Sequence, residues 1–109
     1  MMMGIFKLNL DYQEILRLDS MLNIAKIPHI RHRMFDGWKI AYIADGKVIS
    51  DVVEHMYSYG HERDLIELMD FSFLTGKEED KDEVIGYLSA YEIFKVWNND
   101  YRKRKQILL

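Results

Sequence analysis

Two Asp-Gly dipeptides, Asp36-Gly37 and Asp45-Gly46, constrain the fold of this chain more than any other feature of its sequence. They separate three short runs of alternating or of β-branched and aromatic residues, at 29–35, 38–44 and 47–54. Asp and Gly tolerate the positive φ angles that two-residue hairpin turns need. The pattern therefore predicts three antiparallel strands joined in a meander.

The second dipeptide also predicts a register. If Asp45 and Gly46 alone form the turn, residues at equal distances from it face each other across the two strands. The expected pairs share one face, which would be an aromatic and branched surface for helices to cover. They are Ala44–Lys47, Tyr42–Ile49 and Trp38–Val53.

A helix is expected before the meander. Apolar residues recur at helical spacing between Asp11 and Lys26, and Glu14 completes a capping-box pattern with Asp11. Pro28 predicts the end of this helix, because the residue before a proline is driven out of the helical region.

The segments after the meander complete the expected fold. Residues 61–71 predict a short second helix, and residues 83–88 a fourth strand. A second capping box, Ser89 with Glu92, predicts a last helix that frays beyond about Asp100. The fold class is α+β: an antiparallel β-meander of three to four strands packed with three helices, in the order α-β-β-β-α-β-α.

Length and composition bound the remaining possibilities. A chain of 109 residues has room for one core, so residues 1–109 are expected to form a single domain, with 1–10 and 102–109 as candidate disordered tails. Cysteine is absent, no apolar run is long enough to span a membrane, and no signal-peptide pattern opens the chain. We expect a cytoplasmic protein. A net charge of −3 disfavours nucleic acid as a partner.

The densest group of functional residue types lies between the third strand and the second predicted helix. It contains Ser58, Tyr59, Gly60, His61 and Glu62. Backbone amides at a helix start bind anions, so this turn is a candidate site for a small anionic ligand. The alternative is that Ser58 caps the helix, Gly60 supplies a special backbone angle and the tyrosines pack.

Three further residues are candidates for ligand binding. Alternation along the first strand places Arg31 and Arg33 on one face together with His29, where the arginines could contact phosphates. The alternative for this face is a solvated edge that resists aggregation. His55 adjoins the turn, although a lone histidine at a strand end is more often structural.

Two enzyme motifs are incomplete. Met56 stands where the G-x-S-x-G nucleophile elbow needs glycine, and Leu65 stands where the zinc-protease helix needs its second histidine. His29 and His32 fall on opposite faces of a strand, which makes a poor metal pair. We therefore expect no enzyme, no cofactor and no metal. A small hydrolase that uses His55 and His61 stays open as a weaker alternative.

With these segments placed, the chain resembles a group of small uncharacterised phage and prophage proteins from Gram-positive bacteria. The resemblance covers about residues 20–97 and is carried by FDGWKI (35–40), DVVEH (51–55), SYGHE (58–62), DLIELM (64–69) and VIGYLSAYEIF (84–94). The chain departs from the group at Asp70 and Phe71, where Gly and Leu are usual, and at Tyr91, where the group has an acidic residue. The resemblance implies a phage origin and no catalytic residues.

The expected function is stoichiometric binding inside the bacterial host cell. In its sharpest form the protein is a homo-oligomeric counter-defence protein that sequesters an anionic nucleotide signal at residues 58–62, helped by Arg31 or Arg33. The alternative is a protein–protein inhibitor of a host protein, in which acidic residues 78–83 and exposed aromatic side chains dock onto a basic surface.

Overall fold

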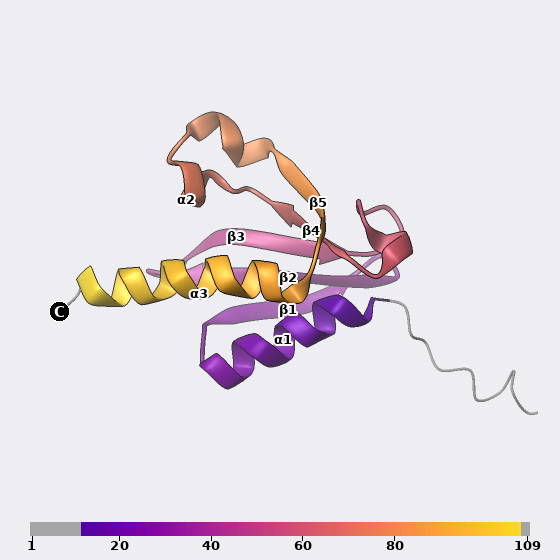
Figure 1. The fold of residues 1–109 in the computed structure, drawn as a ribbon, viewed down its shortest axis with the longest axis horizontal. Helices are drawn as coiled ribbons and strands as arrows, with labels where there is room; N and C mark the ends of the chain where they lie inside the picture. Colours follow the sequence, from indigo (N-terminus) through magenta and orange to yellow (C-terminus); the bar gives the residue numbers. More distant parts are fainter. Residues whose placement is uncertain (1–11, 108–109) are drawn as a thin grey trace, which may run out of the picture.

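The computed structural model describes residues 12–107, which form a five-stranded antiparallel sheet with two long helices on one face (Figure 1). The strands lie side by side in chain order, β1-β2-β3-β4-β5. The predicted α+β class is confirmed, with five strands instead of three to four. The elements are α1 (Gln13–Ala25), β1 (His29–Met34), β2 (Gly37–Ala44), β3 (Lys47–Glu54), the 3₁₀ turn η2 (His61–Arg63), β4 (Ile66–Met69), α2 (Ser72–Thr75), the 3₁₀ turn η3 (Glu78–Asp82), β5 (Val84–Leu88) and α3 (Ala90–Ile107).

Helix α1 has the apolar stripe that its periodicity predicts. Ile15, Leu18 and Leu22 are fully buried between the helix and the sheet. The helix ends where Lys26 takes a left-handed conformation and its N–H bonds back to the carbonyl of Asn23, as expected before Pro28. The predicted cap residue Asp11 lies outside the described residues.

The three-strand meander is confirmed, and its second hairpin keeps the Ala44–Lys47 pair. Beyond that pair the predicted register is wrong. A bulge makes Ile49 an extra residue, so Tyr42 faces Ser50 and Trp38 faces Glu54. The bulge has a physical reason, because it turns the Ile49 side chain into the core, where only 8% of it is exposed.

The first hairpin turn is shifted by one residue from the predicted position. Phe35 and Asp36 form the turn, while Gly37 pairs with Met34 and begins β2. Glycine is required here for close packing, because a Cβ at Gly37 would lie 1.9 Å from the carbonyl oxygen of Glu54.

The predicted second helix over residues 61–71 is wrong. Only His61–Arg63 is helical, as one 3₁₀ turn, and Ile66–Met69 forms strand β4 between β3 and β5. Ile66 and Leu68 enter the core, while Glu67 faces the opposite side of the sheet. A strand in this place pairs the backbone groups of β3 that a helix would leave without partners.

Helix α3 begins at the predicted capping box, in which Ser89 and Glu92 exchange hydrogen bonds of 3.0 and 3.1 Å. It continues to Ile107, well beyond the fraying expected near Asp100. Its fully buried Trp97 stacks on Tyr42 of β2, with ring centroids 5.4 Å apart. The predicted tail from residue 102 is therefore helical as far as Ile107.

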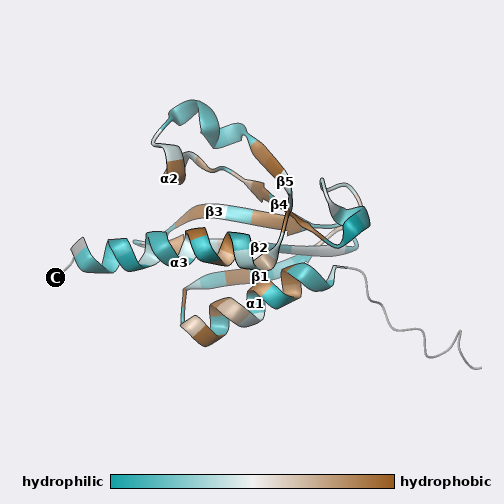
Figure 2. Ribbon diagram, viewed as in Figure 1, coloured by the Kyte–Doolittle hydropathy of each residue, from teal (hydrophilic) through white to brown (hydrophobic). Residues whose placement is uncertain are grey.

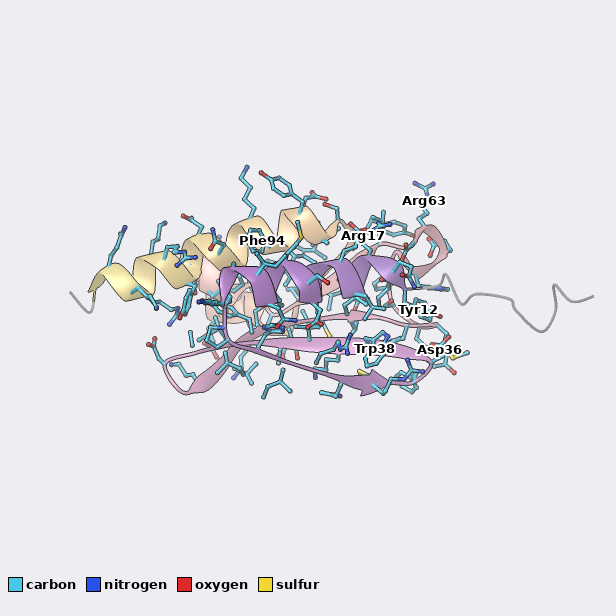
Figure 3. The ribbon with its side chains drawn as sticks, turned by 90° about the horizontal axis from the view of Figure 1, so that it is seen from below. Tyr12, Arg17, Asp36, Trp38, Arg63 and Phe94 are labelled. Atoms are coloured by element: carbon cyan, nitrogen blue, oxygen red, sulfur yellow. The ribbon has the colours of Figure 1, made fainter. Side chains whose placement is uncertain are left out.

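The two faces of the sheet differ. Helices α1 and α3 cover one face, as the view from below shows (Figure 3). On the other face the loop after β3 folds back over the ends of β3, β4 and β5, since the Tyr59 N–H bonds to the Glu67 carboxylate. Hence Val53 and Glu67 are buried on a face without helices.

Between residues 12 and 107, no helix combines the length and the apolar character needed to cross a membrane.

Candidate functional site

The loop between β3 and β4 contains most of the residues predicted to bind a ligand. Ser58 is 3% exposed, and its side chain lies inside the loop. Its hydroxyl oxygen accepts a hydrogen bond from the His55 N–H at 3.0 Å and donates one to the His55 carbonyl at 2.9 Å. Ser58 therefore closes a turn, close to the capping role considered as its alternative.

The backbone amides of this loop bond to acceptors of the protein itself. The N–H of Ser58 donates to the His55 carbonyl, that of Tyr59 to Glu67 Oε1 and that of His61 to the Ser58 carbonyl. These three donors are thus already occupied. An anion at residues 58–62 stays a prediction, and the geometry offers it few amide donors.

Two glycines bring the loop against β5. Gly60 has φ 106°, and a Cβ there would lie 2.9 Å from the backbone nitrogen of Tyr87. A Cβ at Gly86 would lie 2.4 Å from the Tyr59 Cβ. The loop and the strand approach each other so closely that neither position accepts a side chain without movement of the backbone.

His61 and Glu62 lie on the outer side of the loop. The Tyr87 hydroxyl donates to Glu62 Oε1, and this hydrogen bond is the main cause of a lowered pKa of Glu62 and a raised pKa of Tyr87. His61 Nε2 is 4.0 Å from Glu62 Oε2. The contact between Tyr87 and Glu62 joins the loop to β5.

Arg31 and Arg33 point to the helix-covered face of β1, on the same side as His29, as the alternation predicts. Their guanidinium carbons lie 4.3 and 4.5 Å from the ring centroid of Trp38, and Arg31 also pairs with Asp19 at 3.5 Å. No hydrogen bond, ion pair or ring contact among the described residues joins either arginine to residues 58–62. Among the described residues, the arginines and residues 58–62 are therefore not in direct contact, and a nucleotide site that combines them stays a prediction.

His55 lies at the start of the loop and is 6% exposed. Its Nδ1 accepts a hydrogen bond from the Tyr57 N–H at 3.1 Å, which places the proton of the neutral ring on Nε2. Burial lowers the pKa of His55, against the opposing influence of Glu67 and Asp36. Within residues 12–107, no three histidine or acidic side chains gather in a way that could hold a metal ion.

Large apolar side chains are exposed around this loop. We call Phe35, Met56, Tyr57 and Tyr59 the aromatic surface; they are 62%, 47%, 68% and 62% exposed. The Phe35 and Tyr57 rings meet edge to face with centroids 5.0 Å apart, and Phe35 also contacts His55 at 4.9 Å. The sequence indicated exposed aromatic residues only in general terms, without locating them.

The aromatic surface stands on a fixed backbone. The Asp36 carboxylate accepts hydrogen bonds from the Met56 N–H at 2.8 Å and from the Tyr12 hydroxyl, which ties the β1–β2 turn to the loop and to the start of α1. Figure 3 shows Tyr12 and Asp36 at this same end of the molecule. Both turns that carry the exposed rings are thereby held together.

A buried carboxyl group lies beneath this end of the sheet. Glu54 is fully buried, and its Oε2 has no hydrogen-bond partner among residues 12–107. Burial, and secondarily the nearby Asp64 carboxylate, raise the pKa of Glu54 to about 9. At neutral pH the group is therefore a neutral acid. Because the side chain is fully buried, we assign it to the fold and not to a site.

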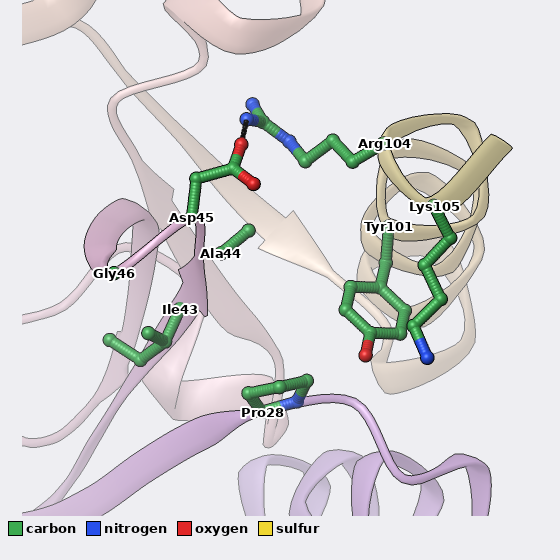
Figure 4. Close-up of a pocket in the computed structure, with 8 residues that line it drawn as sticks. All are labelled: Pro28, Ile43, Ala44, Asp45, Gly46, Tyr101, Arg104 and Lys105. Atoms are coloured by element: carbon green, nitrogen blue, oxygen red, sulfur yellow. Dashed lines mark hydrogen bonds and ion pairs between the residues drawn. The ribbon is translucent and has the colours of Figure 1, made fainter. Parts of the chain in front are cut away.

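A cavity of about 260 Å³ lies at the opposite end, between the β2–β3 hairpin and the last turns of α3 (Figure 4). Its walls include Pro28, Ile43 and Tyr101, with Arg104 and Lys105 at the rim. The Arg104 guanidinium is engaged by Asp45 at 2.7 Å and by Asp100 at 2.6 Å. Sequence reasoning assigned no site here, and the arginine is committed to holding the helix on the hairpin.

Comparison with known proteins found no matching family model, no matching curated protein and no matching solved structure.

Proposed function

We propose that this protein acts by stoichiometric binding to another protein, and that the aromatic surface is its contact. Of the two functions expected from the sequence, this is the protein-binding alternative. For a phage-encoded chain, as the resemblance implies, the partner is a protein of the bacterial host and binding inhibits it.

The main support for this proposal is the position of Phe35. Its φ angle is 52°, in the left-handed region where Gly, Asn and Asp are favoured and a bulky side chain costs free energy. Its ring is nevertheless 62% exposed and contributes little to the core. A phenylalanine in this turn destabilises the folded state through backbone strain, and it also exposes apolar area to water. A role in binding explains why such a residue occupies this position.

The anchored backbone suits the rings for recognition. Aromatic side chains lose few rotamers on binding, and the hydrogen bonds of Asp36 and Ser58 already fix the two turns that present them. Exposed Tyr and Phe side chains on a rigid surface are typical of the residues that dominate protein interfaces.

The expected partner surface is an apolar recess with hydrogen-bond acceptors at its rim for the hydroxyls of Tyr57 and Tyr59. The acidic residues 78–83 do not belong to this contact. They form η3 and the residue before β5, whereas the loop packs against the middle and second half of that strand, at Gly86 and Tyr87. Figure 1 shows η3 apart from the loop. A basic partner surface is therefore not required.

Site-specific crosslinking tests the proposal. A photoreactive phenylalanine analogue at position 57 should give one dominant crosslinked protein in a lysate of a Gram-positive bacterium. The same analogue at Val48, which is 58% exposed on the distant hairpin, should not. A second variant, Phe35→Ser, should abolish the position-57 product, while Val48→Ser leaves it intact. Equal products from positions 57 and 48 would contradict the proposal.

Isothermal titration calorimetry distinguishes protein binding from the alternative function, nucleotide sequestration. Titration with a panel of linear and cyclic nucleotides should give no saturable heat if the protein-binding function is right. Saturable heat that disappears in a His61→Ala variant would favour sequestration at residues 58–62 instead.

A further inference from the structure

The imidazole of His55 packs against two rings of the aromatic surface. Its centroid lies 4.9 Å from that of Phe35 and 6.2 Å from that of Tyr57, and both contacts are edge to face. His55 is nevertheless only 6% exposed, whereas the two neighbouring rings are largely in solvent. A polar ring is thus almost enclosed beside exposed apolar groups, where its nitrogen atoms need hydrogen-bond partners.

One of the two ring nitrogens of His55 has a partner and the other has none. Nδ1 accepts the Tyr57 N–H, so Nε2 bears the proton of the neutral ring. No hydrogen bond or ion pair among residues 12–107 involves Nε2. The fully enclosed side-chain atoms without a partner in this range are Glu54 Oε2 and Trp97 Nε1, so Nε2 is not sealed inside the fold. It is therefore a free donor at the aromatic surface.

Negative charge dominates the surroundings of this donor. The carboxylates of Glu67 on β4 and Asp36 in the β1–β2 turn both act to raise the pKa of His55, and the smaller opposite influence comes from His61 of η2. Figure 2 shows η2 next to the loop as a hydrophilic segment. A carboxylate or phosphate that approached Nε2 would be repelled by the two acids, while a neutral acceptor would not.

We propose that the Nε2–H of His55 donates a hydrogen bond to a backbone carbonyl in an apolar segment of the partner protein, while the Phe35 and Tyr57 rings pack against the side chains of that segment. The inference rests on the proposed function and names the polar contact of the same surface. The partner segment must be apolar and must present an unpaired carbonyl, as the last turn of a helix does. A partner without this acceptor would bury the donor unpaired, which costs affinity.

Protonation of His55 should release the partner. A doubly protonated ring has a proton on Nδ1 and cannot accept the Tyr57 N–H, so the segment that presents Tyr57 loses its anchor. Burial is the main cause that keeps the pKa of His55 below its ordinary value of 6.5, against Glu67 and Asp36. The neutral donor therefore predominates above pH 6.5, and binding should weaken as the pH falls through the lowered pKa.

Nitrogen-15 NMR of the free full chain tests the donor without any partner. Above pH 7 the ring of His55 should be the Nε2–H tautomer, and its titration midpoint should lie below 6.5. A neutral ring with its proton on Nδ1 overturns the inference, whatever the outcome for the proposed function.

Substitutions in the chain with the photoreactive analogue at position 57 test the contact itself. His55→Leu removes the donor and should reduce the crosslinked product by about tenfold. His55→Gln, whose amide N–H can donate from a similar place, should recover most of the product and should abolish its decrease at acid pH. His32→Leu, at an exposed histidine of β1, is the matched control and should leave both the product and its pH dependence unchanged.

Three results of these substitutions overturn the inference and leave the proposed function standing. The first is an undiminished product in His55→Leu. The second is an equal loss in His55→Leu and His55→Gln, which would show that the ring only supports the loop. The third is a product of the unsubstituted His55 chain that stays constant as the pH falls through the midpoint measured by NMR.

Discussion

The backbone N–H of Ile15, in the first turn of α1, donates a 3.0 Å hydrogen bond to Oε1 of Glu54, the last residue of β3 and 39 positions later in the chain. The neighbouring N–H of Glu14 donates to the Asp64 carboxylate, also at 3.0 Å. Two amides that a helix cannot satisfy internally are thus bonded to side chains from the sheet and the following loop. These bonds lock the start of α1 to the end of the sheet that carries the aromatic surface.

The buried acid predicts an unusual pH dependence. Because the pKa of Glu54 is about 9 in the folded chain against an ordinary 4.5, the folded state holds a proton that the unfolded state releases throughout this interval. The stability of the folded state that depends on protonated Glu54 is therefore complete below pH 4.5 and is lost as the pH rises toward 9. Glu54→Gln keeps an oxygen for Ile15 and removes the titration, so it should raise the free energy of unfolding at pH 7 by about 3 kcal/mol.

Urea unfolding at several pH values checks this prediction. The stability gain of Glu54→Gln over the wild type should grow with pH across the interval. Glu79→Gln, at an exposed position on η3, is the matched control and should leave the curve unchanged. A gain that is the same at every pH would contradict the assignment.

Gly37 should tolerate no side chain. Gly37→Ala places a methyl group 1.9 Å from the Glu54 carbonyl oxygen, so β2 and the end of β3 must separate, at a cost of about 3 kcal/mol. Gly46→Ala enters open space and meets only the strain of φ 74°, which costs about 1 kcal/mol. Thermal unfolding of the two variants should rank them in this order, and equal losses would argue against the close approach.

The hydroxyl of Tyr42 should stabilise the packing of α3 on the sheet. It donates a 2.7 Å hydrogen bond to Asp100, which also accepts from Arg104. Tyr42→Phe keeps the stacking on Trp97 and removes the bond, so the free energy of unfolding should fall by about 1 kcal/mol. Tyr91→Phe, at a position 61% exposed, should change it by less than about 0.5 kcal/mol. Chemical denaturation of both variants measures the difference.

The strain at Phe35 can be separated from its ring contacts. Phe35→Ala and Phe35→Asn both remove the contacts with His55 and Tyr57, but asparagine adopts a positive φ more readily than alanine does. Phe35→Asn should therefore be the more stable variant, by about 0.5 kcal/mol. Both should lose the crosslinked partner. A more stable alanine variant would contradict the strain that supports a binding role for this residue.

Local patterns were sufficient for much of the fold. The stripe of Ile15, Leu18 and Leu22 predicts α1, the Ser89–Glu92 box predicts the start of α3, and the Asp-Gly dipeptides predict the meander. Each of these signals acts over a few residues, through capping bonds, turn angles or the side on which apolar groups emerge. No distant contact is needed to interpret them.

Where local preferences for helix and strand are nearly equal, the tertiary structure decided the conformation of the segment. Residues 66–69 are apolar enough for a helix or a strand, and they became β4 because β3 presents unpaired backbone groups on one side and β5 on the other. The bulge at Ile49 likewise follows from space in the core and not from the turn beside it. The aromatic surface likewise depends on tertiary contacts between distant segments.

The sequence by itself determined which residues are chemically capable of binding: the histidines, the arginines, and the tyrosines of the loop. Only the tertiary structure decided which of them are committed elsewhere. Ser58 is turned inward, Arg31 and Arg33 lie against Trp38, and Phe35 is left exposed. The physical reason is that hydrogen bonds and burial between distant segments, such as Glu54 with Ile15, settle the orientation of a side chain, and a linear pattern does not contain those distances.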